Sequence, residues 1–252
     1  MQLIDTAAIV TGGASGLGAA TAAALAAGGA TVFALDLQSG IDAAPDVKGV
    51  TYLPADVTNE EQVRTAVAVA AGTGVPLRTV VNCAGIGPSA RILGRKGVHD
   101  LALYAKVIQI NLVGTFTVLA LASEAIAATD PEANGQRGVI VNTASIAAFE
   151  GQVGQVAYAS SKGGVVGMTL PAARDLAQYG IRVCAIAPGI VDTPMLATVS
   201  AEFRAGLATG IPFPPRLALS EEYAKLVMMI IDHDYLNGET IRMDGALRMA
   251  PR

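Results

Sequence analysis

The sequence predicts a single-domain α/β protein in which a parallel, doubly wound sheet of about seven strands carries helices on both faces. Two observations lead to this fold class. Short apolar runs rich in β-branched residues alternate with longer helical patterns along the 252 residues, which is typical of parallel sheets joined by right-handed crossovers. Apolar residues make up 52% of the chain and charged residues only 15%, as expected for strands that are covered on both faces.

Seven segments are expected to be strands and six to be helices. The strand segments are 7–11, 30–35, 50–54, 78–82, 138–143, 181–187 and 240–243. The helical segments lie near 17–27, 59–71, 99–129, 155–177, 198–208 and 220–232. Thr58 is a candidate cap of the second helix, and Pro171 predicts a kink in the fourth. The proline-rich stretch 194–216 is expected to be a loop-rich insertion, either on the substrate side or a passive surface loop.

Charge and hydropathy argue against two classes of partner. A formal net charge of −4 argues against nucleic-acid binding. Residues 6–35 carry no charge, but six glycines interrupt them, so a buried strand, turn, helix and strand fit better than a membrane span. The apolar run 112–123 is too short to span a bilayer. With no basic region at the start of the chain, we expect no signal peptide and a cytoplasmic location.

The two cysteines and two histidines give no indication of a metal site. Cys83 and Cys184 both lie in apolar, strand-like sequence and are expected to be buried thiols in a reducing compartment. His99 and His233 are the only histidines. Because these side chains show no metal-ligand spacing, we expect no metal site.

The segment TGGASGLG, residues 11–18, follows the first expected strand and precedes an alanine-rich helix. Gly12 permits a sharp exit from the strand, while Gly16 and Gly18 let a pyrophosphate approach the helix N-terminus. A strand, glycine turn and helix is the context of a dinucleotide-binding, Rossmann-type unit. The spacing differs from Gly-x-Gly-x-x-Gly, so a flexible loop is the alternative.

Asp36 ends the next expected strand, eighteen residues after Gly18, where an acidic side chain binds a ribose diol. The 2′-phosphate of NADP needs a basic partner near this strand, but the first basic residue is Lys48. The sequence therefore favours NAD over NADP, unless an arginine approaches from elsewhere.

Tyr158 and Lys162 lie four residues apart, and Ser145 precedes Tyr158 by thirteen. In a helix the tyrosine and lysine share one face. A neighbouring ammonium favours the phenolate, so we expect the pKa of Tyr158 to be lowered from about 10. Such a tyrosine transfers protons near neutral pH. A surface tyrosine and lysine is the alternative for this motif taken alone.

With these motifs in place, the chain resembles the short-chain dehydrogenases/reductases over nearly its whole length. The motifs of that family occur in its order: TGGASGLG, Asp56-Val57, Asn82-Cys83-Ala84-Gly85, Asn111, Ser145, Tyr158-x-x-x-Lys162 and Pro188-Gly189-x-x-x-Thr193. Each motif is weak evidence alone, but seven in order make a chance match implausible.

The resemblance implies a role for each catalytic candidate. Tyr158 would be the general acid/base, and Lys162 would lower its pKa and hold the nicotinamide ribose. Ser145 would hydrogen-bond the substrate oxygen. Asn111 would hold a water that links Lys162 to solvent, a role compatible with a buried asparagine that bonds helix backbone.

The resemblance also implies a set of residues that contact the cofactor NAD. These are Gly12, Ser15, Gly16, Leu17, Gly18, Asp36, Asp56, Val57, Cys83, Ala84, Gly85, Tyr158, Lys162, Pro188, Gly189, Val191 and Thr193. For Cys83 and Val191 the contact would come from the backbone.

Within the family, the sequence around Ser145 and the ending LNGETIRMDGALRM are similar to enzymes that oxidise 3-hydroxyacyl-CoA thioesters with NAD. Arg91, Arg95 and Lys96 would then meet the coenzyme A phosphates, although a solvated basic loop is an equal alternative. Other candidates are a steroid or alcohol dehydrogenase, a 3-oxoacyl-carrier-protein reductase and a non-catalytic scaffold subunit.

The apolar composition and the resemblance together predict a homotetramer. The expected interfaces are the helix that carries Tyr158 and the C-terminal segment 236–252.

Overall fold

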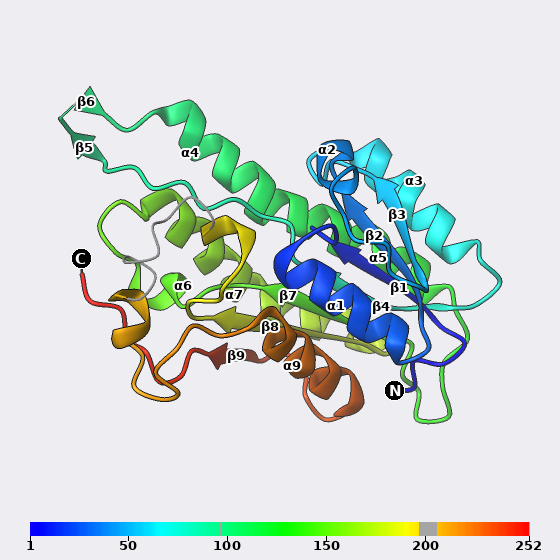
Figure 1. The fold of residues 1–252 in the computed structure, drawn as a ribbon. Helices are drawn as coiled ribbons and strands as arrows, with labels where there is room; N and C mark the ends of the chain where they lie inside the picture. Colours follow the sequence, from blue (N-terminus) through cyan, green and yellow to red (C-terminus); the bar gives the residue numbers. More distant parts are fainter. Residues whose placement is uncertain (96, 197–205, 252) are drawn as a thin grey trace.

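The structure, a computed structural model, describes residues 1–95, 97–196 and 206–251 (Figure 1). Its centre is a parallel sheet in the order β3-β2-β1-β4-β7-β8-β9. The strands are β1 (Ala7–Thr11), β2 (Thr31–Asp36), β3 (Val50–Pro54), β4 (Leu77–Asn82), β7 (Gly138–Thr143), β8 (Ile181–Pro188) and β9 (Thr240–Met243). All seven strands match the predicted segments to within one residue. The central strands β1, β4, β7 and β8 are continuous runs buried on both faces, as expected for a parallel sheet, whereas β3 and β9 at the two edges are only partly buried.

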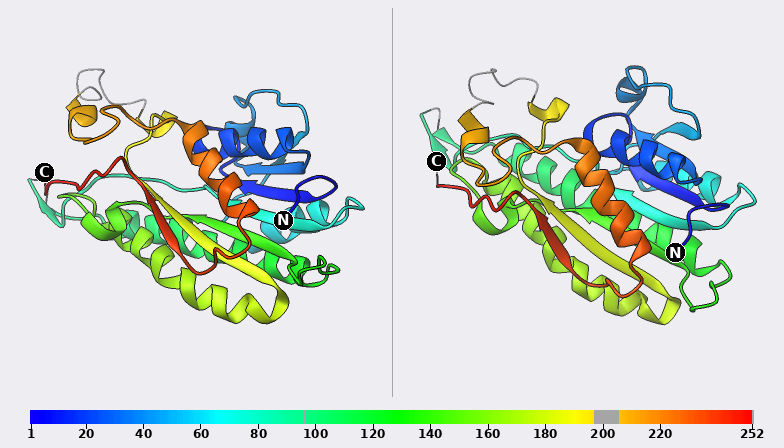
Figure 2. Two further views of the ribbon diagram at one scale, coloured as in Figure 1. Left: turned by 90° about the horizontal axis from the view of Figure 1, so that it is seen from below. Right: turned by 60° about the horizontal axis from the view of Figure 1, so that its bottom comes forward.

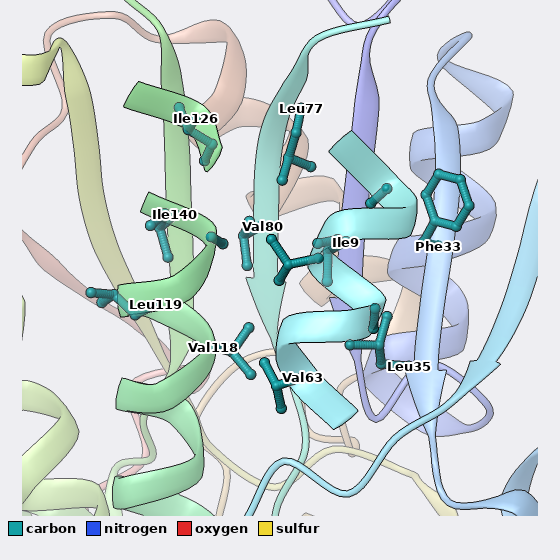
Figure 3. Packing of buried hydrophobic residues seen from close by; sticks show 14 of the residues in the cluster. Ile9, Phe33, Leu35, Val63, Leu77, Val80, Val118, Leu119, Ile126 and Ile140 are labelled. Carbon is teal, nitrogen blue, oxygen red and sulfur yellow. The ribbon is translucent and has the colours of Figure 1, made fainter. Parts of the chain in front are cut away.

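One face of the sheet is covered by α3 (Glu60–Ala71), α5 (Thr115–Ala127) and α7 (Val156–Leu176). Figure 3 shows side chains of α3 and α5 packed against those of β1, β2, β4 and β7. The buried side chains include Ile9, Phe33, Leu35, Val63, Leu77, Val80, Val118, Leu119, Ile126 and Ile140. This core fixes the helices that carry the candidate site residues.

The other face is covered by α1 (Gly16–Ala27) and α9 (Ser220–Asp232), which lie side by side (Figure 2). Arg182 of β8 is buried and donates hydrogen bonds to the carbonyl oxygens of Ile230 and Ile231 in the last turn of α9. Because these carbonyls have no partner within the helix, the arginine both ends α9 and ties it to the sheet.

The predicted helix 99–129 consists of three contiguous parts. They are α4 (Leu101–Ile108), the π-helical segment η1 (Gln109–Gly114) and α5. The run Leu101–Ala127 is long and apolar enough to cross a membrane by length and composition, and 44% of its most apolar window is buried. It is longer than the run 112–123 recognised in the sequence. Core helices of globular proteins also have this length and composition, and α5 packs on the sheet.

Several short elements were not predicted. They are the helices α2 (Gln38–Ile41) and α6 (Ala147–Glu150), the 3₁₀ turns η2 (Ala177–Tyr179) and η3 (Pro194–Leu196), and the hairpin of β5 (Leu93–Gly94) and β6 (Gly97–Val98). Elements of two to four residues are too short to show a hydrophobic period.

Three local predictions have different outcomes. Thr58 is not the cap of α3: Asn59 is, and its side chain accepts a hydrogen bond from the Gln62 amide. The helix α7 runs through Pro171 as one element. Residues 197–205, which hold most of the predicted helix 198–208 and part of the insertion 194–216, lie outside the described residues. Of the predicted helix, residues 206–208 are described and are helical.

Candidate active site

The predicted site residues gather at the carboxyl ends of the parallel strands. The strand order reverses between β1 and β4, since β2 and β3 lie on one side of β1 and the later strands lie beyond β4. A switch point of this kind leaves a crevice at the carboxyl ends, where α/β proteins bind their ligands. The glycine turn after β1 and the segment after β4 border this point.

The glycine turn is close-packed in a way that only glycine permits. Gly12 has a φ of +64°, and a Cβ there would lie 2.9 Å from the Ala84 amide nitrogen. A Cβ at Gly18 would overlap the Gly12 carbonyl oxygen. A Cβ at Gly16 would lie 3.4 Å from Cβ of Thr193. The predicted cofactor segments at the two ends of the chain therefore face each other.

The N-terminus of α1 is open to an anion. Ser15 makes no side-chain cap, and the first turn, which includes Leu17, has no acidic residue. The first amides of a helix lack intrahelical acceptors and attract negative charge. This end of α1 therefore suits a pyrophosphate, and its binding there stays a prediction.

Asp36 lies at the end of β2 beside this turn. Its Oδ2 accepts a hydrogen bond from the Ala14 amide at 3.0 Å, and its Oδ1 accepts one from the Leu37 amide at 2.8 Å. Each carboxylate oxygen retains a lone pair. Asp36 thus anchors the glycine turn and still has acceptor capacity for a ribose.

The segment after β4, residues 83–85, lies between the glycine turn and the catalytic candidates and is here called the floor of the site. Thr11 Oγ1 accepts hydrogen bonds from the amides of Cys83 and Ala84 at 3.1 and 3.2 Å. A Cβ at Gly85 would lie 3.2 Å from Asn111 Oδ1 and 3.7 Å from Lys162 Nζ. The predicted cofactor floor is therefore adjacent to the predicted catalytic residues.

The remaining predicted cofactor residues have mainly structural contacts. Asp56 accepts hydrogen bonds from the amide and hydroxyl of Thr58, and Val57 is buried. Gly189 follows Pro188 at the end of β8, and a Cβ there would meet Asp244 Cα at 2.9 Å. Val191 is buried and pairs with Ala218. None of these contacts shows a cofactor role.

Ser145, Tyr158 and Lys162 come together at the end of β7. Ser145 is buried just beyond this strand, while Tyr158 and Lys162 lie one turn apart on α7. The Ser145 hydroxyl is close enough to the Tyr158 phenol to lower its pKa. Lys162 Nζ is 5.8 Å from the Tyr158 ring centroid and donates a 2.7 Å hydrogen bond to the Thr143 carbonyl oxygen. The three predicted catalytic side chains therefore form one cluster.

The sequence predicts that the pKa of Tyr158 is lowered, and this direction is wrong. Burial raises the pKa of Tyr158 above its ordinary value, and the Ser145 hydroxyl opposes this only in part. Burial also lowers the pKa of Lys162 to about 8. The prediction rests on the charge of Lys162 alone. Removal from water disfavours the charged forms of both Tyr158 and Lys162.

Asn111 lies in η1 and is fully buried. Its Oδ1 accepts a hydrogen bond from the Ile86 amide at 2.8 Å, and its Nδ2 donates to the Ile86 carbonyl at 2.9 Å and to Ser161 Oγ at 3.0 Å. The side chain thus ties the loop after Gly85 to α7. Its predicted water-holding role stays a prediction.

Two residues in contact with this cluster were not singled out from the sequence. Thr143 holds Lys162 through its backbone carbonyl, which any residue type provides. Tyr223 of α9 reaches Thr143 across 80 positions of sequence. A tyrosine among apolar helix residues signals only core packing, so neither contact had a recognisable sequence pattern.

The basic hairpin lies outside this cluster. Arg91, which precedes β5, and Arg95, in the turn between β5 and β6, are both exposed. The hairpin projects from the body of the molecule (Figure 1). Lys96 lies outside the described residues. At the base of the hairpin, the Ala90 amide donates a 2.8 Å hydrogen bond to the Gly154 carbonyl. This contact joins the hairpin to the loop that precedes Tyr158.

Both cysteines are free thiols; Cys184 is buried and Cys83 is partly buried. Among the described residues, no group of three or more His, Cys, Asp and Glu side chains is arranged to hold a metal ion.

Comparison with known proteins agrees with this geometry. The short chain dehydrogenase family matches residues 6–203. The chain is 51% identical to "3-hydroxyacyl-CoA dehydrogenase type-2" of Homo sapiens, covering 97% of this chain and 95% of the relative. It is 50% identical to the Drosophila melanogaster protein of the same name, covering 96% and 97%.

A crystal structure of 3-hydroxyacyl-CoA dehydrogenase type-2 from Mycobacterium avium superimposes with a TM-score of 0.91 at 41% identity, covering 98% of both chains. The fold, the family match and the relatives therefore agree across almost the whole chain. This chain belongs to the short chain dehydrogenase family and is an oxidoreductase.

Proposed function

We propose that this protein is an NAD-dependent dehydrogenase that interconverts 3-hydroxyacyl-CoA and 3-oxoacyl-CoA. The observation that carries the proposal is the cluster of Ser145, Tyr158 and Lys162 beside the glycine turn. The names of relatives at about 50% identity over nearly the full chain support this substrate class.

The residues around the crevice fit a nicotinamide dinucleotide. The uncapped end of α1 suits its pyrophosphate, the close-packed glycines leave room for it, and Asp36 suits a ribose diol. When bound, such a cofactor supplies a hydride acceptor or donor. Thr193, opposite Gly16, and Lys162 would hold its nicotinamide half.

The protein's own residues handle the proton. In the oxidation direction the Tyr158 phenolate accepts the proton of the C3 hydroxyl, while Ser145 donates a hydrogen bond to the same oxygen. The Lys162 ammonium stabilises the phenolate electrostatically. Because burial raises the pKa of Tyr158 in the free chain, this positive charge and a hydrogen-bonded substrate oxygen are both needed to form the phenolate near neutral pH.

NAD is proposed over NADP because of the charge at Asp36. The carboxylate stands at the end of β2, next to the glycine turn. It would repel a 2′-phosphate and accept hydrogen bonds from an unmodified ribose.

The basic hairpin supports coenzyme A as the carrier. Arg91 and Arg95 are exposed, and the hairpin base is bonded to the Gly154 loop beside Tyr158. Phosphate groups outside the acyl pocket would meet these guanidinium groups.

We expect the protein to reduce acetoacetyl-CoA with a higher kcat/KM than acetoacetyl-pantetheine, which lacks the nucleotide. The variant Arg91→Gln/Arg95→Gln/Lys96→Gln should raise KM for the CoA ester roughly fivefold to tenfold, since exposed charge pairs are individually weak. If kcat stays constant, the lost contacts bound the substrate and the transition state equally. Steady-state kinetics on both thioesters checks this.

Arg174→Gln, which removes an exposed charge from α7, is the matched control and should leave both KM values unchanged. Equal kcat/KM values for the two thioesters in the parent protein would remove the phosphate contact. Absence of activity on both would favour a steroid, an alcohol or a carrier-protein thioester as substrate.

We also propose a homotetramer. Phe116 of α5 and Leu170 of α7 are large apolar side chains that stay exposed on the outer layer. In addition, β9 is an edge strand paired only with β8 in the described sheet. Exposed apolar faces and open strand edges favour association of identical chains.

Light scattering at micromolar concentration is expected to give the mass of four chains, and Phe116→Asp should lower it. Lys48→Gln, which removes an exposed charge from the loop before β3, should keep the parental mass. A monomer mass for the parent protein would contradict this proposal.

A further inference from the structure

Tyr223 brings a hydroxyl group from α9 to the ends of β4 and β7. Its side chain is fully buried. The hydroxyl lies 2.7 Å from Thr143 Oγ1 and 3.7 Å from Cys83 Sγ. These two partners flank the candidate site: Cys83 lies in its floor, and the Thr143 carbonyl holds Lys162 Nζ. Tyr223 approaches from the face opposite to α7.

The direction of the hydrogen bonds follows from the number of protons. The Thr143 hydroxyl has one proton and lies 2.6 Å from the Asn82 carbonyl oxygen, which can only accept. Thr143 therefore donates to Asn82, and Tyr223 must donate to Thr143. The Tyr223 oxygen is then free to accept from the Cys83 thiol. Burial raises the pKa of Tyr223 well above 10, so this donor keeps its proton.

The chain Cys83, Tyr223, Thr143 and Asn82 thus joins the ends of two strands. It fixes the backbone that follows β4, which Thr11 also holds through the Cys83 and Ala84 amides. It also fixes the residue whose carbonyl anchors Lys162 at 2.7 Å. Hydrogen bonds that point the same way along a buried chain strengthen one another.

We infer that Tyr223 is a positioning residue for the reaction: through Thr143 it sets the position of Lys162, and through Cys83 and Asn82 it sets the floor of the cofactor site. It touches neither substrate nor cofactor. The assignment rests on the proposed nicotinamide site, and its kinetic readout rests on the proposed substrate.

The test is Tyr223→Phe, which keeps the ring and removes the hydroxyl. The dissociation constant for NADH, measured by nicotinamide fluorescence, should rise roughly threefold to tenfold, the effect of one lost hydrogen bond. With acyl-CoA substrate, the acidic limb of the kcat profile for oxidation should move to higher pH, because a displaced Lys162 stabilises the phenolate less. A purely structural tyrosine would lower the melting temperature without moving either readout.

Two variants of Thr143 test whether the Tyr223 hydroxyl acts through this threonine. Thr143→Ser keeps the hydroxyl and should retain the parental NADH affinity, whereas Thr143→Val should reproduce Tyr223→Phe, and the double variant should be no worse than either single one. Tyr52→Phe is the matched control, since that hydroxyl bonds only the Pro45 carbonyl outside the site.

An unchanged NADH dissociation constant in both Tyr223→Phe and Thr143→Val would overturn the inference. If the parent protein turns over no acyl-CoA ester, the proposed substrate fails, but the NADH measurement still decides the role of Tyr223.

Discussion

Tyr158→Phe is expected to lower kcat at least ~100-fold, the effect of losing a general acid/base. The side chain is half-buried on α7, with its hydroxyl close to Ser145 and its ring 5.8 Å from Lys162 Nζ. The phenyl ring preserves the packing, so the dissociation constant for NADH should change little. Steady-state kinetics and nicotinamide fluorescence measure the two quantities separately.

Lys162→Ala is the informative companion to this variant. Lys162 is predicted both to stabilise the phenolate and to hold the nicotinamide ribose, so its loss should reduce kcat and NADH affinity together. Tyr179→Phe, in the turn after α7, removes an exposed phenol and should behave as the parent protein. A Tyr158→Phe variant that retains more than about a tenth of the parental rate would exclude Tyr158 as the acid/base.

Asp36→Ala is expected to lower kcat/KM for NAD roughly thirtyfold while leaving kcat/KM for NADPH unchanged or higher. The carboxylate is the predicted acceptor for the ribose diol, and hydrogen bonds to charged acceptors are individually strong. Its removal also frees the Ala14 amide, which Asp36 Oδ2 now holds at 3.0 Å. Initial rates with both cofactors at one pH and salt concentration give the comparison.

Asp36→Asn tests the negative charge separately from the hydrogen bond that holds the glycine turn. Its amide oxygen can still accept a hydrogen bond from the Ala14 amide. This variant should tolerate NADPH better than the parent protein and keep more NAD activity than Asp36→Ala. Asp42→Ala removes a nearby exposed carboxylate that bonds Gln38, and should change neither ratio. The prediction is wrong if the parent protein already uses NADPH better than NADH.

Much of this fold follows directly from the sequence. The central strands are continuous runs buried on both faces, so their limits are visible in the composition itself, as for β1 and β7. The glycine turn was equally visible, because Gly12 and Gly18 occupy positions where a Cβ would meet backbone. Local sterics require particular residue types at such positions, and the residue types are what a sequence records.

The short elements and the pKa of Tyr158 could not be predicted from neighbouring residues. The four residues of α6 have no hydrophobic period, and they fold where Arg242 bonds Glu150 from 92 positions away. Likewise, the pKa of Tyr158 is raised although Lys162 is four residues away, because burial disfavours the phenolate and Ser145 offsets this only in part.

The sequence by itself determined the sheet, the glycine turn and the identity of the residues Ser145, Tyr158 and Lys162. Only the tertiary structure decided how Lys162 is held, through the Thr143 carbonyl, and that Tyr223 bonds the hydroxyl of the same threonine. Local conformation depends on neighbouring residue types and is written in the chain. Contacts to backbone atoms, and contacts between distant segments, depend on where the whole sheet and its helices place those atoms.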